Sequence, residues 1–65
     1  MVSMQPTLNI NGRYTAKEAS EALGVHRNSL RNYEKAGLIR SGMHRSNGRK
    51  FYTGREIIRF WKSTL

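Results

Sequence analysis

The sequence contains no cysteine and no aspartate, and its four acidic residues are all glutamates. Without cysteine, neither a disulfide framework nor a thiolate zinc site can stabilise the chain. Two histidines and four carboxylates offer few ligands for a metal and few candidates for a catalytic pair. No apolar run approaches the roughly 20 residues that span a bilayer, and no basic region followed by an apolar stretch indicates a signal peptide. We therefore expect no enzyme activity, no cofactor, no metal and no membrane contact.

Positive charge is abundant and unevenly placed. The chain of 65 residues holds 12 Lys or Arg, which gives a formal net charge of +8. Residues 1–25 balance to zero, whereas residues 26–59 hold nine cations and two glutamates, a balance of +7. Eight of the twelve cations are arginine, whose planar guanidinium suits phosphates and guanine edges. A chain this short forms one small domain, and its clustered charge predicts a polyanionic partner.

The first part of the chain divides into a tail and a helix. Residues 1–13 lack helical periodicity and include the only proline, so we interpret them as a flexible N-terminal tail, with a weak strand pattern at 8–10. The predicted domain covers residues 14–65. Thr15 followed by Glu18 is a capping-box pattern that starts a helix, and the glycine after Leu23 is a typical left-handed stop.

A second helix is expected over residues 27–36, ended by Gly37. With Leu30 at the centre of its buried face, Tyr33 lies about 60° to one side, at roughly 100° per residue. A solvated helix would normally interleave glutamate with lysine or arginine on its exposed face. This helix instead exposes an arc of two amides and three cations, and only Glu34 lies near the edge of the arc. The arc consists of Arg27, Asn28, Arg31, Asn32 and Lys35.

A hairpin and a third helix complete the predicted domain. The apolar pairs Leu38-Ile39 and Phe51-Tyr52 flank a stretch rich in glycine and serine, which predicts a two-stranded hairpin with a long mobile tip. Thr53 with Glu56 repeats the capping-box pattern, so a third helix should begin near Gly54. Its apolar face is expected to contain Ile57, Phe60, Trp61 and Leu65.

Two helices joined by a glycine-containing turn are typical of the helix-turn-helix, whose second helix enters the major groove of DNA. Asn28 and Asn32 suit adenine edges, and Arg27 and Arg31 suit guanine edges or phosphates. The basic hairpin fits a wing on the backbone or minor groove, and the start of the first helix offers a weaker phosphate contact. The candidate DNA-binding residues are Thr15, Lys17, Arg27, Asn28, Arg31, Asn32, Tyr33, Lys35, Arg45, Arg49 and Lys50.

Several motifs over about residues 14–62 resemble the DNA-binding domain of the MerR family. They are Tyr14-Thr15, Gly24-Val25, Leu30-Arg31-Asn32-Tyr33-Glu34, Gly37-Leu38-Ile39 and Asn47-Gly48-Arg49-Lys50-Phe51-Tyr52. The resemblance implies a mainly α winged helix-turn-helix fold, with three short helices and a two-stranded β-hairpin wing. It also implies that the second helix enters the major groove and that the wing contacts the backbone and minor groove.

Carried over by position, the resemblance places Asn28 and Arg31 on the reading helix and makes Tyr33 a phosphate partner. Three positions depart from the family pattern. Lys50 stands where the family prefers arginine, Asn32 where it prefers an aromatic residue, and Asn28 where it often has a basic residue. These departures concern sequence preference more than fold.

The sequence therefore predicts a protein that binds double-stranded DNA as a MerR-like transcription regulator or accessory factor. MerR regulators continue into a dimerising coiled coil and an effector region, whereas this sequence stops at Leu65. Either it is an excised domain, or it is complete and resembles excisionases, which bend DNA and bind adjacent sites cooperatively.

Other expectations follow from the same interpretation. Self-association on tandem or palindromic sites is an expectation, and no small-molecule effector is evident. The expected location is cytoplasmic and nucleoid-associated, in a bacterial or phage-encoded context. An RNA-binding module and a protein-interaction module remain as alternatives of a different class.

Overall fold

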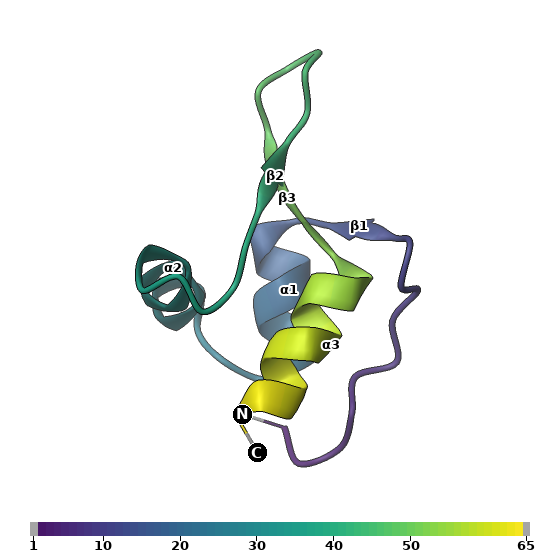
Figure 1. Ribbon diagram of the computed structural model, residues 1–65, viewed down its shortest axis with the longest axis vertical. Coiled ribbons are helices and arrows are strands. Elements are labelled where there is room, and N and C mark those ends of the chain that lie inside the picture. The colour runs from purple at the N-terminus through teal and green to yellow at the C-terminus, as the bar shows by residue number, and fades with distance from the viewer. Residues whose placement is uncertain (1, 65) are drawn as a thin grey trace.

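The computed structural model describes residues 2–64, which form three helices and three short strands. In Figure 1, α1 and α3 lie side by side, α2 stands to one side of them, and the β2–β3 hairpin projects away from the helices. This is a winged helix-turn-helix arrangement, as predicted. The elements in chain order are β1 (Arg13–Tyr14), α1 (Ala16–Leu23), α2 (Arg27–Lys35), β2 (Gly42–Met43), β3 (Lys50–Thr53) and α3 (Gly54–Ser63).

Local capping determines where α1 and α2 begin and end. The Thr15 hydroxyl accepts from the Glu18 N–H at 3.2 Å, and the Glu18 carboxylate accepts from the Thr15 N–H at 3.0 Å, so the predicted capping box is present. Gly24 ends α1 in the left-handed region at φ 72°. At α2, His26 acts as the N-cap because its Nδ1 accepts from the Asn28 N–H at 3.1 Å.

The start of α3 depends on a distant segment of the chain. The Thr53 hydroxyl accepts from the Glu56 N–H, but the Glu56 carboxylate turns to other partners, so only half of the predicted second capping box forms. The first N–H groups of α3 instead donate to two backbone carbonyls: Gly54 to Gly12 at 3.0 Å and Arg55 to Ile10 at 3.1 Å. These bonds satisfy groups that a helix start otherwise leaves unpaired.

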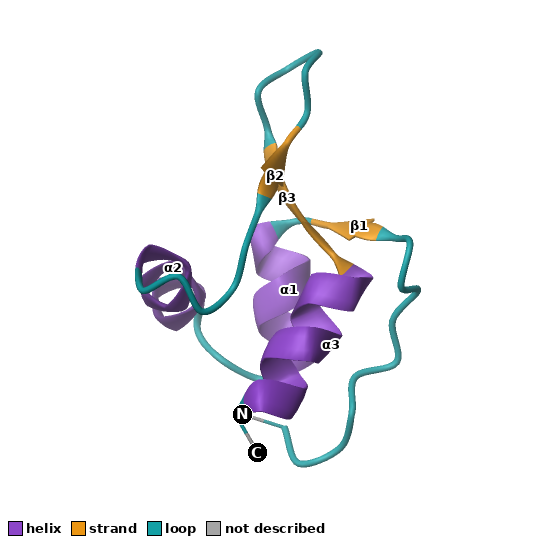
Figure 2. Ribbon diagram, in the orientation of Figure 1, coloured by secondary structure: helices purple, strands orange, loops and turns teal. Residues whose placement is uncertain are grey.

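The small sheet has the order β1-β3-β2, with both pairings antiparallel. Figure 2 shows the three strands meeting above the helices, at the base of the hairpin. The prediction of a wing strand at Leu38-Ile39 is wrong. The Leu38 N–H still donates to the Tyr33 carbonyl, in the turn after α2. Ile39 is buried in the core, and strand pairing begins only at Gly42.

One hydrophobic cluster joins all three helices to β3. Its buried members are Ala19, Leu23, Leu30, Ile39, Tyr52, Ile57, Phe60 and Trp61. Ile57, Phe60 and Trp61 of α3 belong to this cluster, as the sequence predicts. Leu65, also expected on that apolar face, lies outside the described residues.

The segment before residue 14, expected to be a tail, contacts the domain in the structure. Val2 donates its N–H to the Leu23 carbonyl at 2.9 Å and accepts from the Trp61 indole at 3.0 Å. Leu8 packs against the core, and the predicted strand at 8–10 is instead irregular, with β1 at Arg13–Tyr14. We therefore propose that the folded unit begins before the predicted boundary at residue 14.

Candidate nucleic-acid interface

The outer face of α2 carries the polar arc that the sequence indicates. All five of its side chains are exposed, whereas Leu30 on the opposite face is only 1% exposed. The first turn of α2 has no acidic residue and contains Arg27, a charge that opposes the helix dipole. A residue that lowers the stability of its helix is expected where that surface binds a ligand.

Tyr33 lies between the arc and the core. Its ring is half-buried, and the ring centroid is 4.9 Å from that of Phe60 at an interplanar angle of 40°. The side chain therefore packs α2 against α3.

The hairpin tip is a hydrogen-bonded turn that presents two arginines. His44 donates its N–H to the Arg49 carbonyl at 2.9 Å, and the Gly48 N–H donates to the His44 carbonyl at 2.8 Å. Gly48 adopts φ 67°, which favours glycine, and the Asn47 side chain accepts from the Arg49 N–H. Arg45 and Arg49 are both exposed here.

The base of the hairpin is stiffened by aromatic contacts that the sequence did not indicate. The Phe51 ring lies 4.6 Å from the His44 ring and 4.9 Å from the guanidinium carbon of Arg13. A Cβ at Gly42 would lie 2.6 Å from the Cζ atom of the same ring, so a larger residue at this position would require the ring to shift. Arg13 comes from β1, so the segment before α1 supports the wing.

A concave surface lies between α2 and β3, and we call it the junction. Its lining residues are Ala16, Arg27, Leu30, Arg31, Lys50 and Tyr52. Three cations from two elements therefore converge beside the start of α1. Thr15 and Lys17 are exposed at that helix start, but Thr15 already uses both its hydroxyl and its N–H in the capping box.

Glu34, which the sequence placed at the edge of the arc, connects α2 to β3. Its Oε1 lies 2.6 Å from the Lys50 Nζ, and its Oε2 accepts from the Tyr52 hydroxyl at 2.7 Å. Partial burial raises the pKa of Glu34, but hydrogen bonds from Lys50, Tyr52 and Ser41 outweigh this and lower the pKa below its ordinary value. Lys50, expected to contact DNA, is thus paired with a carboxylate.

The remaining cations of the basic segment, residues 26–59, are not paired with a carboxylate in this way. Glu34 and Glu56 are the only acids in residues 26–59, and each is paired with one cation. Among the described residues, seven other cations of this segment make no ion pair: Arg27, Arg31, Lys35, Arg40, Arg45, Arg49 and Arg55. They extend over α2, the loop that follows it, the wing and the start of α3.

A comparison with known protein families identifies the family of this chain. The model of the MerR family regulatory proteins matches residues 15–52, more than half of the chain. The chain belongs to the MerR family. No curated protein and no solved structure gives a match. The match confirms the resemblance, and it makes the protein a DNA-binding domain of a regulatory family.

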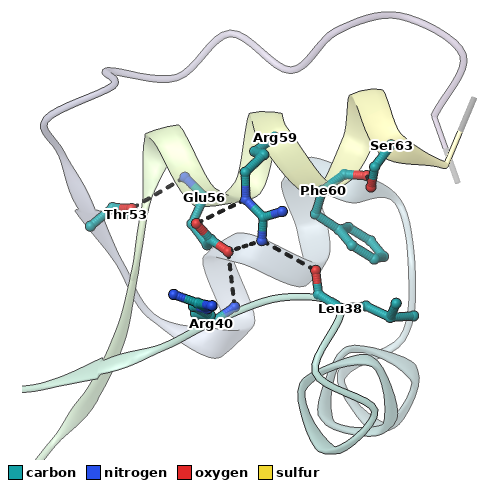
Figure 3. A network of polar contacts seen from close by, with 7 residues as sticks. All are labelled: Leu38, Arg40, Thr53, Glu56, Arg59, Phe60 and Ser63. Atoms are coloured by element: carbon teal, nitrogen blue, oxygen red, sulfur yellow. Dashed lines mark hydrogen bonds and ion pairs between the residues drawn. The ribbon is translucent and has the colours of Figure 1, made fainter.

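The part of this MerR-family domain beyond the match includes α3, where a second polar network holds the loop after α2. The Glu56 carboxylate accepts from the Arg40 backbone N–H at 3.1 Å and from two nitrogens of Arg59. Arg59 also donates to the Leu38 carbonyl at 3.4 Å. Figure 3 shows the Arg59 guanidinium lying between the Glu56 carboxylate and the loop that contains Leu38 and Arg40. The network fixes the chain that connects α2 to the wing.

The Glu56 network predicts acid sensitivity. Hydrogen bonds from Arg59 are the main reason that the pKa of Glu56 lies below its ordinary value of 4.5, although partial burial acts in the opposite direction. A carboxylate with a lowered pKa stabilises the fold above pH 4.5, and this contribution is lost as the pH falls through the folded-state value. We expect Glu56→Gln to lower the melting temperature at pH 7 and to weaken its fall on acidification, as measured by circular dichroism.

The matched control is Glu21→Gln on α1, because Glu21 is exposed and makes no ion pair among the described residues. Its acid profile should follow that of the wild type. An identical profile for Glu56→Gln and the wild type would contradict the assignment.

Two further observations concern other kinds of site. Among residues 2–64, no helix combines the length and hydrophobicity needed to cross a bilayer. Within the same residues, no cluster of three or more histidine or glutamate side chains is placed to hold a metal ion.

Proposed function

We propose that this MerR-family domain binds double-stranded DNA with α2 in the major groove and with the β2–β3 wing on the backbone or minor groove. The observation that carries the proposal is the exposed arc of α2, with two amides, three cations and no acidic residue. An α-helix fits the major groove, and amide and guanidinium groups match the hydrogen-bonding edges of adenine and guanine.

Individual roles follow from position. Asn28 and Asn32 are proposed to read adenine, and Arg27 and Arg31 to read guanine or bind phosphates. The other proposed backbone and minor-groove contacts come from side chains at the edges of α2, the wing tip and the start of α1: Thr15, Lys17, Tyr33, Lys35, Arg45 and Arg49. Lys50 lies beside this surface, at the junction, where it is paired with Glu34.

Arg31→Ala tests the proposal. We expect a loss of about 1–3 kcal/mol in specific binding and a relaxed base preference, because one base-edge or phosphate contact is removed from the arc. Selection from random duplexes would first identify a preferred site. Fluorescence anisotropy would then give the affinity for that site and for a scrambled duplex.

Arg55→Ala is the charge-matched control for Arg31→Ala. Arg55 is an exposed cation at the start of α3, away from the arc. Equal losses for the two variants would mean that only net charge matters and that α2 does not read the groove.

A second candidate is an excisionase-like architectural role, in which adjacent copies bend the duplex. It is favoured by the seven cations without ion pairs, which extend beyond α2 to the wing and α3, because bent DNA contacts more protein surface than straight DNA. Titration of duplexes with one site and with tandem sites separates the two. Cooperative filling with bending supports the architectural role, whereas one palindromic site bound by two copies supports the regulator.

A further inference from the structure

We propose that Glu34 is a specificity-determining residue, which withholds Lys50 from DNA phosphates and holds the wing in a fixed orientation relative to α2. The proposal rests on the proposed function, in which α2 and the wing contact neighbouring grooves. It assigns to Glu34 a positioning role and removes Lys50 from the expected set of phosphate contacts.

The Glu34 carboxylate connects α2 directly to β3 of the wing. Lys50 and Tyr52 are two positions apart on β3 and so lie on the same face of the strand. Each contacts a different oxygen of the Glu34 carboxylate, at 2.6 and 2.7 Å. Tyr52 is only 2% exposed, so its hydroxyl anchors the carboxylate from the core side. The second oxygen is then presented to Lys50 at the surface.

The charges explain why Lys50 stays with Glu34. The Lys50 side chain is 43% exposed and the Glu34 side chain 21%, so the pair is accessible to a DNA strand. If Lys50 moved to a phosphate, Glu34 would remain as an unpaired negative charge facing a polyanion. Ion pairs this exposed contribute little to folding stability, so the pair has its main consequence in binding.

The ion pair between Lys50 and Glu34 affects specific and non-specific binding differently. Non-specific affinity comes from phosphate contacts, and each contact adds roughly 0.9 to the slope of log affinity against log salt concentration. A cation paired with Glu34 adds nothing to that slope. Specific binding depends instead on base contacts and on the wing orientation, which the pair with Lys50 maintains. Glu34 therefore raises the ratio of specific to non-specific affinity.

Glu34→Gln tests this inference, with a selected and a scrambled duplex titrated from about 50 to 200 mM salt by fluorescence anisotropy. We expect tighter binding to scrambled DNA, a salt slope steeper by about one contact, and a lower specificity ratio. Glu21→Gln adds the same charge on α1, where Glu21 is exposed, and should not steepen the slope. A purely structural role for Glu34 would not move either readout upward.

Variants of Lys50 complete the cycle. Lys50→Gln alone should leave the slope unchanged, and Glu34→Gln with Lys50→Gln should return it to the wild-type value, since no lysine remains to be released. The inference is overturned if Lys50→Gln lowers the slope by about one contact, if the double variant stays as steep as Glu34→Gln, or if Glu34→Gln behaves like Glu21→Gln.

Arg31→Ala separates this inference from the proposed function. If Arg31→Ala weakens specific binding while Glu34→Gln behaves like Glu21→Gln, only the role of Glu34 is wrong. If Arg31→Ala has no effect on the selected duplex, the placement of α2 in the major groove is wrong.

Discussion

Replacing Trp61 with alanine is expected to lower the free energy of unfolding by about 3–5 kcal/mol. The side chain is 7% exposed and belongs to the hydrophobic core cluster of residues 2–64. Its indole N–H also donates to the Val2 carbonyl at 3.0 Å, so the substitution removes both core volume and the bond that holds the start of the chain. A domain of this size has a total stability of roughly 0.05–0.15 kcal/mol per residue. The loss is therefore comparable with the whole stability of the fold.

Chemical denaturation followed by far-ultraviolet circular dichroism measures this loss. Tryptophan fluorescence cannot be used, because Trp61 is the only tryptophan. Trp61→Phe serves as the control, since it keeps an aromatic ring in the core and removes the N–H donor. Its cost should be clearly smaller. A cost below about 1 kcal/mol for Trp61→Ala would mean that the side chain is not part of the core.

Gly54→Ala is expected to destabilise the domain by about 3 kcal/mol, at the upper end of ordinary overpacking. An added Cβ would lie 2.0 Å from the Asn9 carbonyl oxygen and 2.8 Å from its carbon. Both atoms belong to the backbone, so neither can move away as a flexible side chain would. The required shift would also strain the bonds from the first two N–H groups of α3 to the Gly12 and Ile10 carbonyls.

Thermal and chemical unfolding of Gly54→Ala would be compared with Arg55→Ala. Arg55 is the next residue of the same helix and is exposed, so its truncation should change stability little. If Gly54→Ala also unfolds like the wild type, the segment around Asn9 yields to the new methyl group. That result would separate residues 9–12 from the cooperative unit of the fold.

Local patterns in the sequence predicted the helices well. The Thr15 and Glu18 side chains bond to each other's backbone, and Gly24 supplies its own left-handed conformation, so the information lies within a few residues. The phase of α2 was equally predictable, because Leu30 is its one fully buried side chain. The family itself was also recognisable from short motifs.

Tertiary contacts account for what the sequence could not predict about the fold. Leu38-Ile39 looks like a strand, but the turn after α2 continues through Leu38 and directs Ile39 into the core. Gly54 reads as an ordinary helix start, and its need to be glycine comes from Asn9, far away in the sequence. The role of residues before Tyr14 likewise depends on partners in α1 and α3.

At the candidate site too, local features could be predicted from the sequence and tertiary contacts could not. Exposure of the arc follows from helical periodicity and was predicted from the spacing alone. The bonds from Glu34 to Lys50 and from Glu56 to the Arg40 N–H were not, because each joins groups 16 residues apart that no local rule connects. Glu34 was visible only as the acidic edge of a basic arc. Glu56 was interpreted as a cap, and its carboxylate instead has stronger partners in Arg59 and the Arg40 N–H.

The bond between Val2 and Trp61 has a consequence for whatever is attached to this domain. It places the start of the described chain beside the end of α3, at the pole of the molecule opposite the tip of the wing (Figure 1). A polypeptide, fluorophore or purification tag joined before Val2 or after Thr64 would therefore leave from that pole. Two labels placed there would report on each other's distance, while the hairpin remains free to approach a duplex.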